Sequence, residues 1–279
     1  MHTAAPALPA STRIAFIGGG NMASAIIGGL IRQGLPAARI DVVEPFEATR
    51  AALLQQHGVT ALPAAGPQLA GADLIVWAVK PQSFRAAAAP VAPHVGSALQ
   101  LSVMAGIRSG DIAAASGARR IVRCMPNTPA LVGRGMTGLF AAPEVSAADR
   151  ALAEAVIRTT GEALWLEHEA QLDAVTALSG SGPAYVFYFL EAMQQAGGEL
   201  GLSPEQARRL AVATFAGGAH LAAASSEPLA TLRERVTSKG GTTYAALTAM
   251  DQAGVKPAFV AAMHAACARA KELGDEFGR

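Results

Sequence analysis

The stretch from residue 14 to residue 23 has the residue types and spacing best suited to bind a ligand. Four apolar residues precede a glycine turn, and an apolar segment then continues to about Gln33. The turn matches the pattern G-x-G-x-x-A through Gly18, Gly20 and Ala23. In that pattern the first glycine permits a tight turn, the second lets a pyrophosphate approach the main chain, and the small third residue lets a helix pack against the strand.

The N–H groups at the start of such a helix face the phosphates of the ligand. Glycine turns also join strands to helices in folds that bind no cofactor, but a strand before this turn and a helix after it favour the dinucleotide interpretation. The predicted dinucleotide-binding residues of this turn are Gly18, Gly19, Gly20, Asn21, Met22 and Ala23.

Two further stretches follow apolar runs and are predicted to end strands of the same sheet. The runs cover residues 73–79 and 99–104. Ligands bind outside the carboxyl ends of parallel strands, and small residues at such ends let a flat nicotinamide ring approach. The alternative is that these residues only make the turns that strand ends require. The predicted cofactor-binding residues here are Ala78, Val79, Lys80, Pro81, Met104, Ala105 and Gly106.

Glu44 ends a second predicted strand, at residues 40–43, and follows Gly20 by 24 residues. An acidic residue at this place holds the two ribose hydroxyls of NAD and repels the 2′-phosphate of NADP. Arg50 follows six residues later and can pair with a phosphate or with Glu44. The alternative is a solvated glutamate before Pro45, so the cofactor choice stays open at this point.

A polar, glycine-rich loop from Val236 to Thr243 opens a helix in the second half of the chain. Successive N–H groups at a helix start form an anion site, and nearby hydroxyl groups suit a small carboxylate. The alternative is an ordinary glycine loop capped by Thr242 or Thr243. The segment Ser179–Pro183 is predicted to be a similar loop at the start of another helix.

The first half of the chain alternates short apolar runs with helical runs, which predicts βαβ units and a mostly parallel, doubly wound sheet. Residues 120–125 form a further predicted strand, and residues 136–141 and 163–166 are predicted edge strands. Between these two, Ser146 and Asp149 form a capping-box pattern that begins a helix. The predicted domains are a loose N-terminal tail at 1–12, a dinucleotide-binding domain at 13–167 and an all-helical domain at 168–279.

The second half contains no convincing strand after residue 167. Helices are predicted at residues 183–200, 204–224, 243–253 and 257–277, and Ser203 caps the second of them. The residues of 209–224 are apolar nearly all round, so this helix must be covered on every side. Because 51% of the chain is hydrophobic and only 15% is charged, we expect a second copy of the chain to cover these helices.

Composition excludes several classes of function. The net charge of +1 gives no basic patch for nucleic acid, and the most apolar window, at 184–190, is too short to span a bilayer. Two cysteines, Cys124 and Cys267, give no disulfide framework, which favours a reducing cytoplasm. The six histidines lack metal-ligand spacing, and there is no G-x-S-x-G or Walker pattern. We therefore expect no metal site, and a cofactor that carries the chemistry.

Five motifs together resemble the pyrroline-5-carboxylate reductase family. They are Phe-Ile-Gly-Gly-Gly-Asn-Met-Ala at 16–23, Ala-Val-Lys-Pro at 78–81, Met-Pro-Asn-Thr-Pro-Ala at 125–130, Ser-Gly-Ser-Gly-Pro-Ala-Tyr at 179–185 and Thr-Ser-Lys-Gly-Gly-Thr-Thr at 237–243. The resemblance implies an N-terminal α/β Rossmann domain followed by an all-α C-terminal dimerisation domain. It implies reduction of the cyclic imine 1-pyrroline-5-carboxylate by NAD(P)H, the last step of proline synthesis, in a homodimer or a pentamer of dimers.

The resemblance also implies roles for single residues. Those that would hold the substrate carboxylate are Ser238, Gly240, Gly241, Thr242 and Thr243. Thr243 would lie near the imine nitrogen as a proposed proton donor. Many family members carry a small hydroxyl residue suited to NADPH where this chain has Glu44, so NADPH is expected and NADH is possible. Lys239 stands where others often have proline, which concerns only loop stiffness.

Two other classes of function fit part of this pattern. One is a related imine reductase or a hydroxyacid dehydrogenase of the same two-domain type. A hydroxyacid dehydrogenase would need a lysine base on the helix at 183–200, which has no lysine. The other is a non-catalytic sensor that binds NADP, which the intact loop at 238–243 disfavours.

Overall fold

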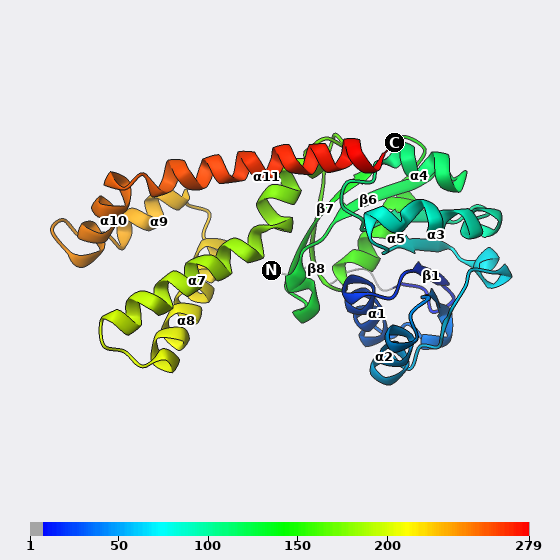
Figure 1. Ribbon diagram of the computed structural model, residues 1–279, viewed down its shortest axis with the longest axis horizontal. Helices are drawn as coiled ribbons and strands as arrows, with labels where there is room; N and C mark the ends of the chain where they lie inside the picture. Colours follow the sequence, from blue (N-terminus) through cyan, green and yellow to red (C-terminus); the bar gives the residue numbers. More distant parts are fainter. Residues whose placement is uncertain (1–7, 279) are drawn as a thin grey trace. The chain divides into compact units, whose positions relative to one another are not determined.

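The computed structural model describes residues 8–278 (Figure 1). Its contacts divide the chain into two compact units. The first contains residues up to Ser181 together with those from Ala266 onward, and the second contains Gly182–Ala265. The domain boundary that the sequence places between residues 167 and 168 stays a prediction.

Residues 8–12 are not the loose tail expected there. Thr12 is buried, its N–H donates to the Pro9 carbonyl at 2.9 Å, and Leu8 packs against the hydrophobic core. A turn therefore attaches this segment to the first unit, which sequence composition does not reveal. The rest of the predicted tail, residues 1–7, lies outside the described part of the chain.

One eight-stranded sheet organises the first unit, in the order β3-β2-β1-β4-β5-β6-β7-β8. All neighbours are parallel except β6 and β7, which are antiparallel. This confirms the doubly wound, mostly parallel sheet. The strands are β1 Ile14–Ile17, β2 Ile40–Val43, β3 Ala61–Leu62, β4 Leu74–Trp77, β5 Leu99–Ser102, β6 Ile121–Met125, β7 Gly135–Ala141 and β8 Gly161–Trp165.

The two segments expected to be edge strands are β7 and β8. The expectation is confirmed for β8, which ends the sheet, and is wrong for β7, which lies between β6 and β8. β7 is mostly buried, whereas Glu162 and Leu164 of β8 are exposed. Gly138 lets α6 pack closely on the face of β7, since a Cβ on it would lie 3.0 Å from the methyl groups of Val175. This close packing from the second half of the chain leaves no local sequence signal.

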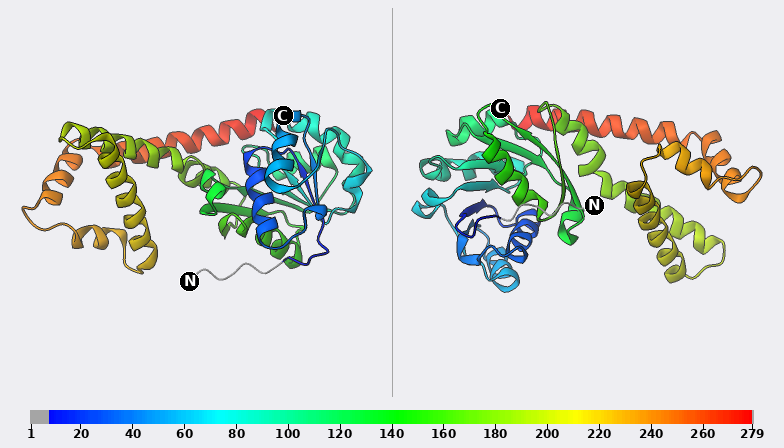
Figure 2. Two further views of the ribbon diagram at one scale, coloured as in Figure 1. Left: turned by 90° about the horizontal axis from the view of Figure 1, so that it is seen from below. Right: turned by 180° about the vertical axis from the view of Figure 1, so that it is seen from behind.

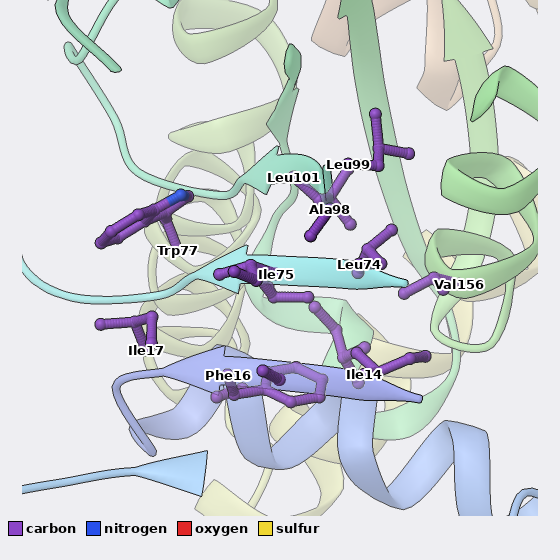
Figure 3. Close-up of a cluster of buried hydrophobic side chains, with 14 of the residues drawn as sticks. Ile14, Phe16, Ile17, Leu74, Ile75, Trp77, Ala98, Leu99, Leu101 and Val156 are labelled. Atoms are coloured by element: carbon purple, nitrogen blue, oxygen red, sulfur yellow. The ribbon is translucent and has the colours of Figure 1, made fainter. Parts of the chain in front are cut away.

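The centre of the sheet is buried on both faces. Every residue of β1 and β4 is buried, and Figure 3 shows their side chains beside those of β5 and Val156. Continuous apolar strands of this kind require helices on both sides. The helices of this unit are α1 Asn21–Arg32, α2 Glu47–His57, α3 Phe84–Val91, α4 Ser109–Ser116, α5 Ala147–Arg158 and α6 Gln171–Val175.

Two helix boundaries follow the predicted signals. The Ser146 hydroxyl accepts the Asp149 N–H at 3.1 Å, and the Asp149 carboxylate accepts the Ser146 N–H at 3.0 Å, so α5 begins with a capping box. Gly58 ends α2 in the left-handed conformation, with φ of 66°.

The segment Ser179–Pro183 is not the loop predicted from its glycines. α6 continues into a π-helical turn at Thr176–Gly180, and the Ser181 N–H donates to the Thr176 carbonyl at 2.8 Å. Gly180 serves close packing here, since a Cβ on it would lie 2.5 Å from the Met125 Cε atom. The small residue therefore marks a helix packed against the end of β6.

The second unit is all-helical, and no strand occurs among the described residues after β8. Its helices are α7 Gly182–Glu199, α8 Pro204–Ala224, α9 Leu229–Arg235, α10 Thr242–Gln252 and the first part of α11 Val255–Phe277. α7 and α8 pack against each other, as Figure 2 shows. The side chain of Ser203 caps α8 by accepting the Gln206 N–H at 3.2 Å.

Apolar side chains of the second unit are exposed in the single chain. Only Gly197, Ala207 and Ala211 are buried within α7 and α8. Helices with so little cover of their own need an outside partner. The large apolar side chains that remain exposed include Phe187, Tyr188, Leu210, Leu221, Tyr244, Met250 and Val260.

Candidate active site

Three of the predicted cofactor stretches meet at the carboxyl edge of the central strands. The Gly18 N–H donates to the Val43 carbonyl at 2.8 Å. In the same way the Ala78 N–H donates to the Ile17 carbonyl at 2.8 Å, and the Val103 N–H donates to the Trp77 carbonyl at 3.0 Å. These bonds continue the parallel ladders into the turns after β1, β4 and β5. The structure therefore brings the turns together at the edge where doubly wound sheets bind ligands.

The three glycines of the first turn differ in what a Cβ atom at each position would contact. Gly18 has φ of +97°, and a Cβ on it would lie 2.6 Å from the Ala78 carbonyl oxygen. A Cβ on Gly19 would lie 2.7 Å from the Leu53 Cδ1 atom. Gly20 is exposed, and a Cβ on it would meet no atom within 4 Å. The surface over Gly20 is therefore open, as a dinucleotide pyrophosphate requires.

The start of α1 offers main-chain donors at the same place. Gly20 is the N-cap residue, and no side chain in the described part of the chain caps this helix end. The first bond of the helix runs from the Ser24 N–H to the Gly20 carbonyl at 2.9 Å, so the N–H groups of Asn21, Met22 and Ala23 have no partner within the helix. With the positive end of the helix dipole, these donors fit a phosphate group.

Glu44 is buried, with 6% of its surface exposed, so the solvated alternative is wrong. Its carboxylate accepts the Gly19 N–H at 2.8 Å and the Phe46 N–H at 2.9 Å. The Arg50 guanidinium donates to the carbonyls of Glu44 and Pro45, at 3.1 Å and 2.6 Å, and not to this carboxylate. Glu44 therefore supports the glycine turn directly.

The turns after β4 and β5 differ in exposure. Ala78, Val79 and Pro81 are half-buried, and Lys80 is exposed. Met104 is buried, while Ala105 and Gly106 are half-buried. Gly106 has φ of +76°, and a Cβ on it would lie 3.3 Å from the Leu273 carbonyl carbon. The end of α11 thus packs directly against the turn after β5.

The predicted substrate loop lies in the second unit. Gly240 has φ of +75°, and the Gly241 N–H donates to the Ser238 carbonyl at 3.0 Å. α10 then begins at Thr242 with Gly241 as its N-cap and with no side-chain cap from any described residue. Capping by Thr242 or Thr243, the alternative interpretation, is therefore wrong. The N–H groups at the helix start are left for an anion.

The hydroxyl groups of this loop also lie at its surface. Ser238 and Thr242 are exposed and Thr243 is half-buried. A Cβ on Gly241 would lie 2.6 Å from the Ser238 hydroxyl oxygen, so glycine lets the serine fold back toward the helix start. The loop thus collects three hydroxyls and free main-chain donors in one short segment.

Two further features of the described residues concern Cys124 and the possible ligands of a metal ion. Burial raises the pKa of the Cys124 thiol strongly, which keeps it protonated and unreactive at neutral pH. Residues 8–278 contain no group of three or more His, Cys, Asp or Glu side chains placed to hold a metal ion. The same residues include no helix of a length and hydropathy that would cross a membrane.

Comparison with known proteins agrees with this geometry. A family model described as pyrroline-5-carboxylate reductase dimerisation matches residues 169–273, and one described as NADP oxidoreductase, coenzyme F420-dependent, matches residues 13–106. The pyrroline-5-carboxylate reductase of Pseudomonas aeruginosa is 44% identical over 269 residues, covering 96% of this chain and 98% of that protein. The chain belongs to the pyrroline-5-carboxylate reductase family.

Solved structures of pyrroline-5-carboxylate reductases have the same fold. The enzyme of Coxiella burnetii superimposes with a TM-score of 0.87 at 37% identity, over 94% of this chain and 98% of that one. The Plasmodium falciparum pyrroline carboxylate reductase, whose structure has NADP bound, gives a TM-score of 0.85 at 27% identity, over 95% and 98%.

Two motifs of the pyrroline-5-carboxylate reductase resemblance contact each other in the first unit. The Asn127 side chain donates to the Ser179 carbonyl at 3.2 Å and accepts the Met136 N–H at 2.9 Å. Asn127 therefore joins the π-helical turn to β7. The sequence shows both motifs but gives no sign that they are neighbours.

Sequence reasoning missed a charged group behind the turn after β5. Arg123 is 7% exposed in the middle of β6 and pairs with Glu169 at 2.7 Å. The Glu169 carboxylate also accepts the Ser109 N–H and hydroxyl, at 2.7 Å and 2.8 Å. The available signal was an arginine within an apolar strand, since a buried arginine needs a partner.

Proposed function

We propose that this protein reduces 1-pyrroline-5-carboxylate to L-proline with NAD(P)H, the last step of proline biosynthesis. The observation that carries the proposal is the presence of two open anion sites in one chain of this family. One is the surface over Gly20 at the start of α1, and the other is the uncapped start of α10. The first suits a dinucleotide and the second suits a small carboxylate.

In the proposed cofactor site, the N–H groups of Asn21 to Ala23 bind the pyrophosphate. The nicotinamide lies against the small residues Ala78, Ala105 and Gly106 at the ends of β4 and β5. When bound, the cofactor supplies a hydride to the carbon of the C=N bond. The protein's own contribution is therefore to hold and orient the reactants.

In the proposed substrate site, the carboxylate accepts hydrogen bonds from the N–H groups at the start of α10 and from the Ser238 and Thr242 hydroxyls. Gly240 and Gly241 let the carboxylate approach the main chain. The Thr243 hydroxyl holds the imine nitrogen. Because a threonine hydroxyl is a weak acid, it positions the nitrogen or relays a proton from water.

Finer properties belong to the same proposal. We propose NADPH as the preferred cofactor, with NADH accepted because Glu44 is acidic. Two copies form a dimer through their helical second units, since those helices expose apolar side chains, and dimers assemble further into a decamer. The two cysteines are free thiols in the structure, which suits the reducing cytoplasm.

The test is oxidation of NADPH by the purified protein with and without 1-pyrroline-5-carboxylate, together with detection of proline. Turnover that requires the imine and yields proline supports the proposal. Binding of NADPH without turnover would identify a sensor instead. A Gly20→Val variant serves as the control, because a side chain there fills the open surface and should prevent cofactor binding.

A further inference from the structure

The turn after β5 is held by a carboxylate that lies far along the chain. Glu169, just before α6, accepts the Ser109 N–H at 2.7 Å and the Ser109 hydroxyl at 2.8 Å, across 60 residues of sequence. The same carboxylate accepts a hydrogen bond from the Arg123 guanidinium at 2.7 Å. One side chain therefore joins the start of α4, the middle of β6 and the approach to α6.

This carboxylate is charged although it is half-buried. Burial raises the pKa of Glu169, but the hydrogen bonds from Ser109 and the charge of Arg123 outweigh that effect and lower the pKa overall. The Arg123 side chain is itself only 8% exposed. A half-buried ion pair persists when its hydrogen bonds are satisfied, and these two groups satisfy one another.

Ser109 is close to the proposed nicotinamide contact. It is the first residue of α4, and only Ile107 and Arg108 separate it from Gly106. The Arg108 guanidinium pairs with Asp275 at 2.5 Å near the end of α11. The turn is thus fixed on one side by Glu169 and on the other by α11.

The space beside this turn is not fully packed. A cavity of about 20 Å³ borders it and is lined in part by Met104, Gly106, Arg123 and Thr176. That volume holds one water molecule and is too small for a nicotinamide. Because side chains do not fill the space, polar contacts contribute more to the position of the turn than they would over a close-packed core.

We propose that Glu169 is a positioning residue of the cofactor site, which through Ser109 fixes the turn Met104–Gly106 against which the nicotinamide lies. The inference rests on the proposed function. It predicts an effect on the cofactor that a purely structural ion pair would not produce.

The test compares Glu169→Gln with Glu154→Gln in the full-length protein. Glu154 is a matched control: it is half-buried, its pKa is also lowered, and its partners are Arg158 at 2.6 Å and Trp165 at 2.8 Å. Those partners lie on α5 and β8. The measurements are the Kd of NADPH by fluorescence titration, the steady-state constants for both reactants, and the melting temperature.

We expect Glu169→Gln to lower kcat/KM for NADPH about 10- to 100-fold, as small misplacements at a reacting centre do. The KM for the imine should stay within about twofold of the wild-type value, because other residues form the proposed substrate site. Glu154→Gln should lower the melting temperature without changing the Kd of NADPH. Equal values of kcat/KM and Kd for NADPH in the two variants would overturn the inference.

A Ser109→Ala variant keeps the Arg123–Glu169 pair and removes only the hydroxyl contact, so it tests the proposal even if Glu169→Gln does not fold. It should also weaken NADPH binding, and the double variant should lose no more than Glu169→Gln alone. Additive losses would overturn the route through Ser109, and normal NADPH binding in Ser109→Ala would overturn the contribution of its hydroxyl, because the main-chain N–H of residue 109 still donates to Glu169. A wild-type protein that neither binds NADPH nor reduces the imine would instead refute the proposed function.

Discussion

The carboxylate of Glu44 accepts the main-chain N–H of Gly19 at 2.8 Å and so ties the end of β2 to the turn after β1. The second oxygen accepts the N–H of Phe46, at the start of α2. A residue usually considered for its contact with the ribose therefore also shapes the glycine turn itself. Changes at this position should alter both cofactor choice and stability.

Replacing Glu44 with serine removes a buried negative charge from the cofactor edge. We expect the ratio of kcat/KM for NADPH to that for NADH to rise about tenfold, because the carboxylate repels a 2′-phosphate. The free energy of unfolding should fall by about 1–3 kcal/mol, since two N–H groups lose their acceptor. Steady-state kinetics with both cofactors and urea unfolding measure these effects. Glu47→Ser, at an exposed position on α2, is the control, and an unchanged ratio in Glu44→Ser would limit the carboxylate to a structural role.

Alanine at Gly18 should destabilise the protein more than alanine at Gly34. Both glycines have φ of +97°, but a Cβ on Gly18 would lie 2.6 Å from the Ala78 oxygen, whereas a Cβ on Gly34 meets nothing within 4 Å. Gly34→Ala should cost about 1 kcal/mol of unfolding free energy from backbone strain. Gly18→Ala should cost about 3 kcal/mol and weaken NADPH binding. Thermal melts and NADPH titrations compare the pair, and equal losses would show that the Ala78 contact is unimportant.

Alanine at Thr243 should lower kcat about 100-fold, the range expected when a group that assists proton transfer is lost. The Kd of NADPH should not change, because the residue lies outside the cofactor turns. Thr248→Ala is the matched control, since its hydroxyl donates to the Tyr244 carbonyl within the same helix at 2.8 Å. Single-turnover kinetics measure the step directly. Reduction at the wild-type rate would remove Thr243 from the reaction.

Stability should fall as the solution becomes acidic, partly through His57. Burial, and then the charge of Arg32, lowers the pKa of His57, and its Nε2 lies 2.8 Å from the Ser24 hydroxyl. As the pH falls through about 6.5, the unfolded chain binds a proton before the folded chain does, so the free energy of unfolding decreases.

A His57→Gln variant should flatten this dependence between about pH 8 and about pH 5.5. Urea unfolding at both pH values provides the measurement. His168→Gln, at an exposed position, keeps the wild-type slope if the effect belongs to His57. A slope in His57→Gln that matches the wild type would assign the dependence to the carboxylates instead.

The strands of the first unit were predictable because buried parallel strands appear as continuous apolar runs. Residues 40–43 match β2. The run at 73–79 begins one residue before β4 and exceeds it at the end, where apolar residues continue into the turn at Ala78 and Val79. β3 was missed because two residues carry no periodic signal. α9 was missed because its Leu229–Arg235 sequence is short and follows a polar, proline-containing stretch.

The turns of the candidate site were predictable where they depend on local main-chain geometry. Gly18, Gly20 and Gly240 indicate turns, which the structure has, and a Cβ on Gly20 or Gly240 would meet no atom within 4 Å. The contacts of Glu44 with Gly19 and of Glu169 with Ser109 were not predictable, since they join residues 25 and 60 positions apart. Ser179–Pro183 is helical although its sequence predicts a loop, because glycine and serine also favour loops and the π-helical turn at Thr176–Gly180 runs into it.

The exposed apolar side chains of the second unit make a partner subunit thermodynamically equivalent to a ligand. A protomer that buries Phe187, Leu210 and Leu221 against a second copy is stabilised by mass action. When the protein concentration is well above the dissociation constant of the dimer, each tenfold increase in concentration adds about 1.4 kcal/mol to the free energy of unfolding of the dimer. We therefore expect dilution alone to weaken the helical unit and its melting temperature to depend on concentration as well as on sequence.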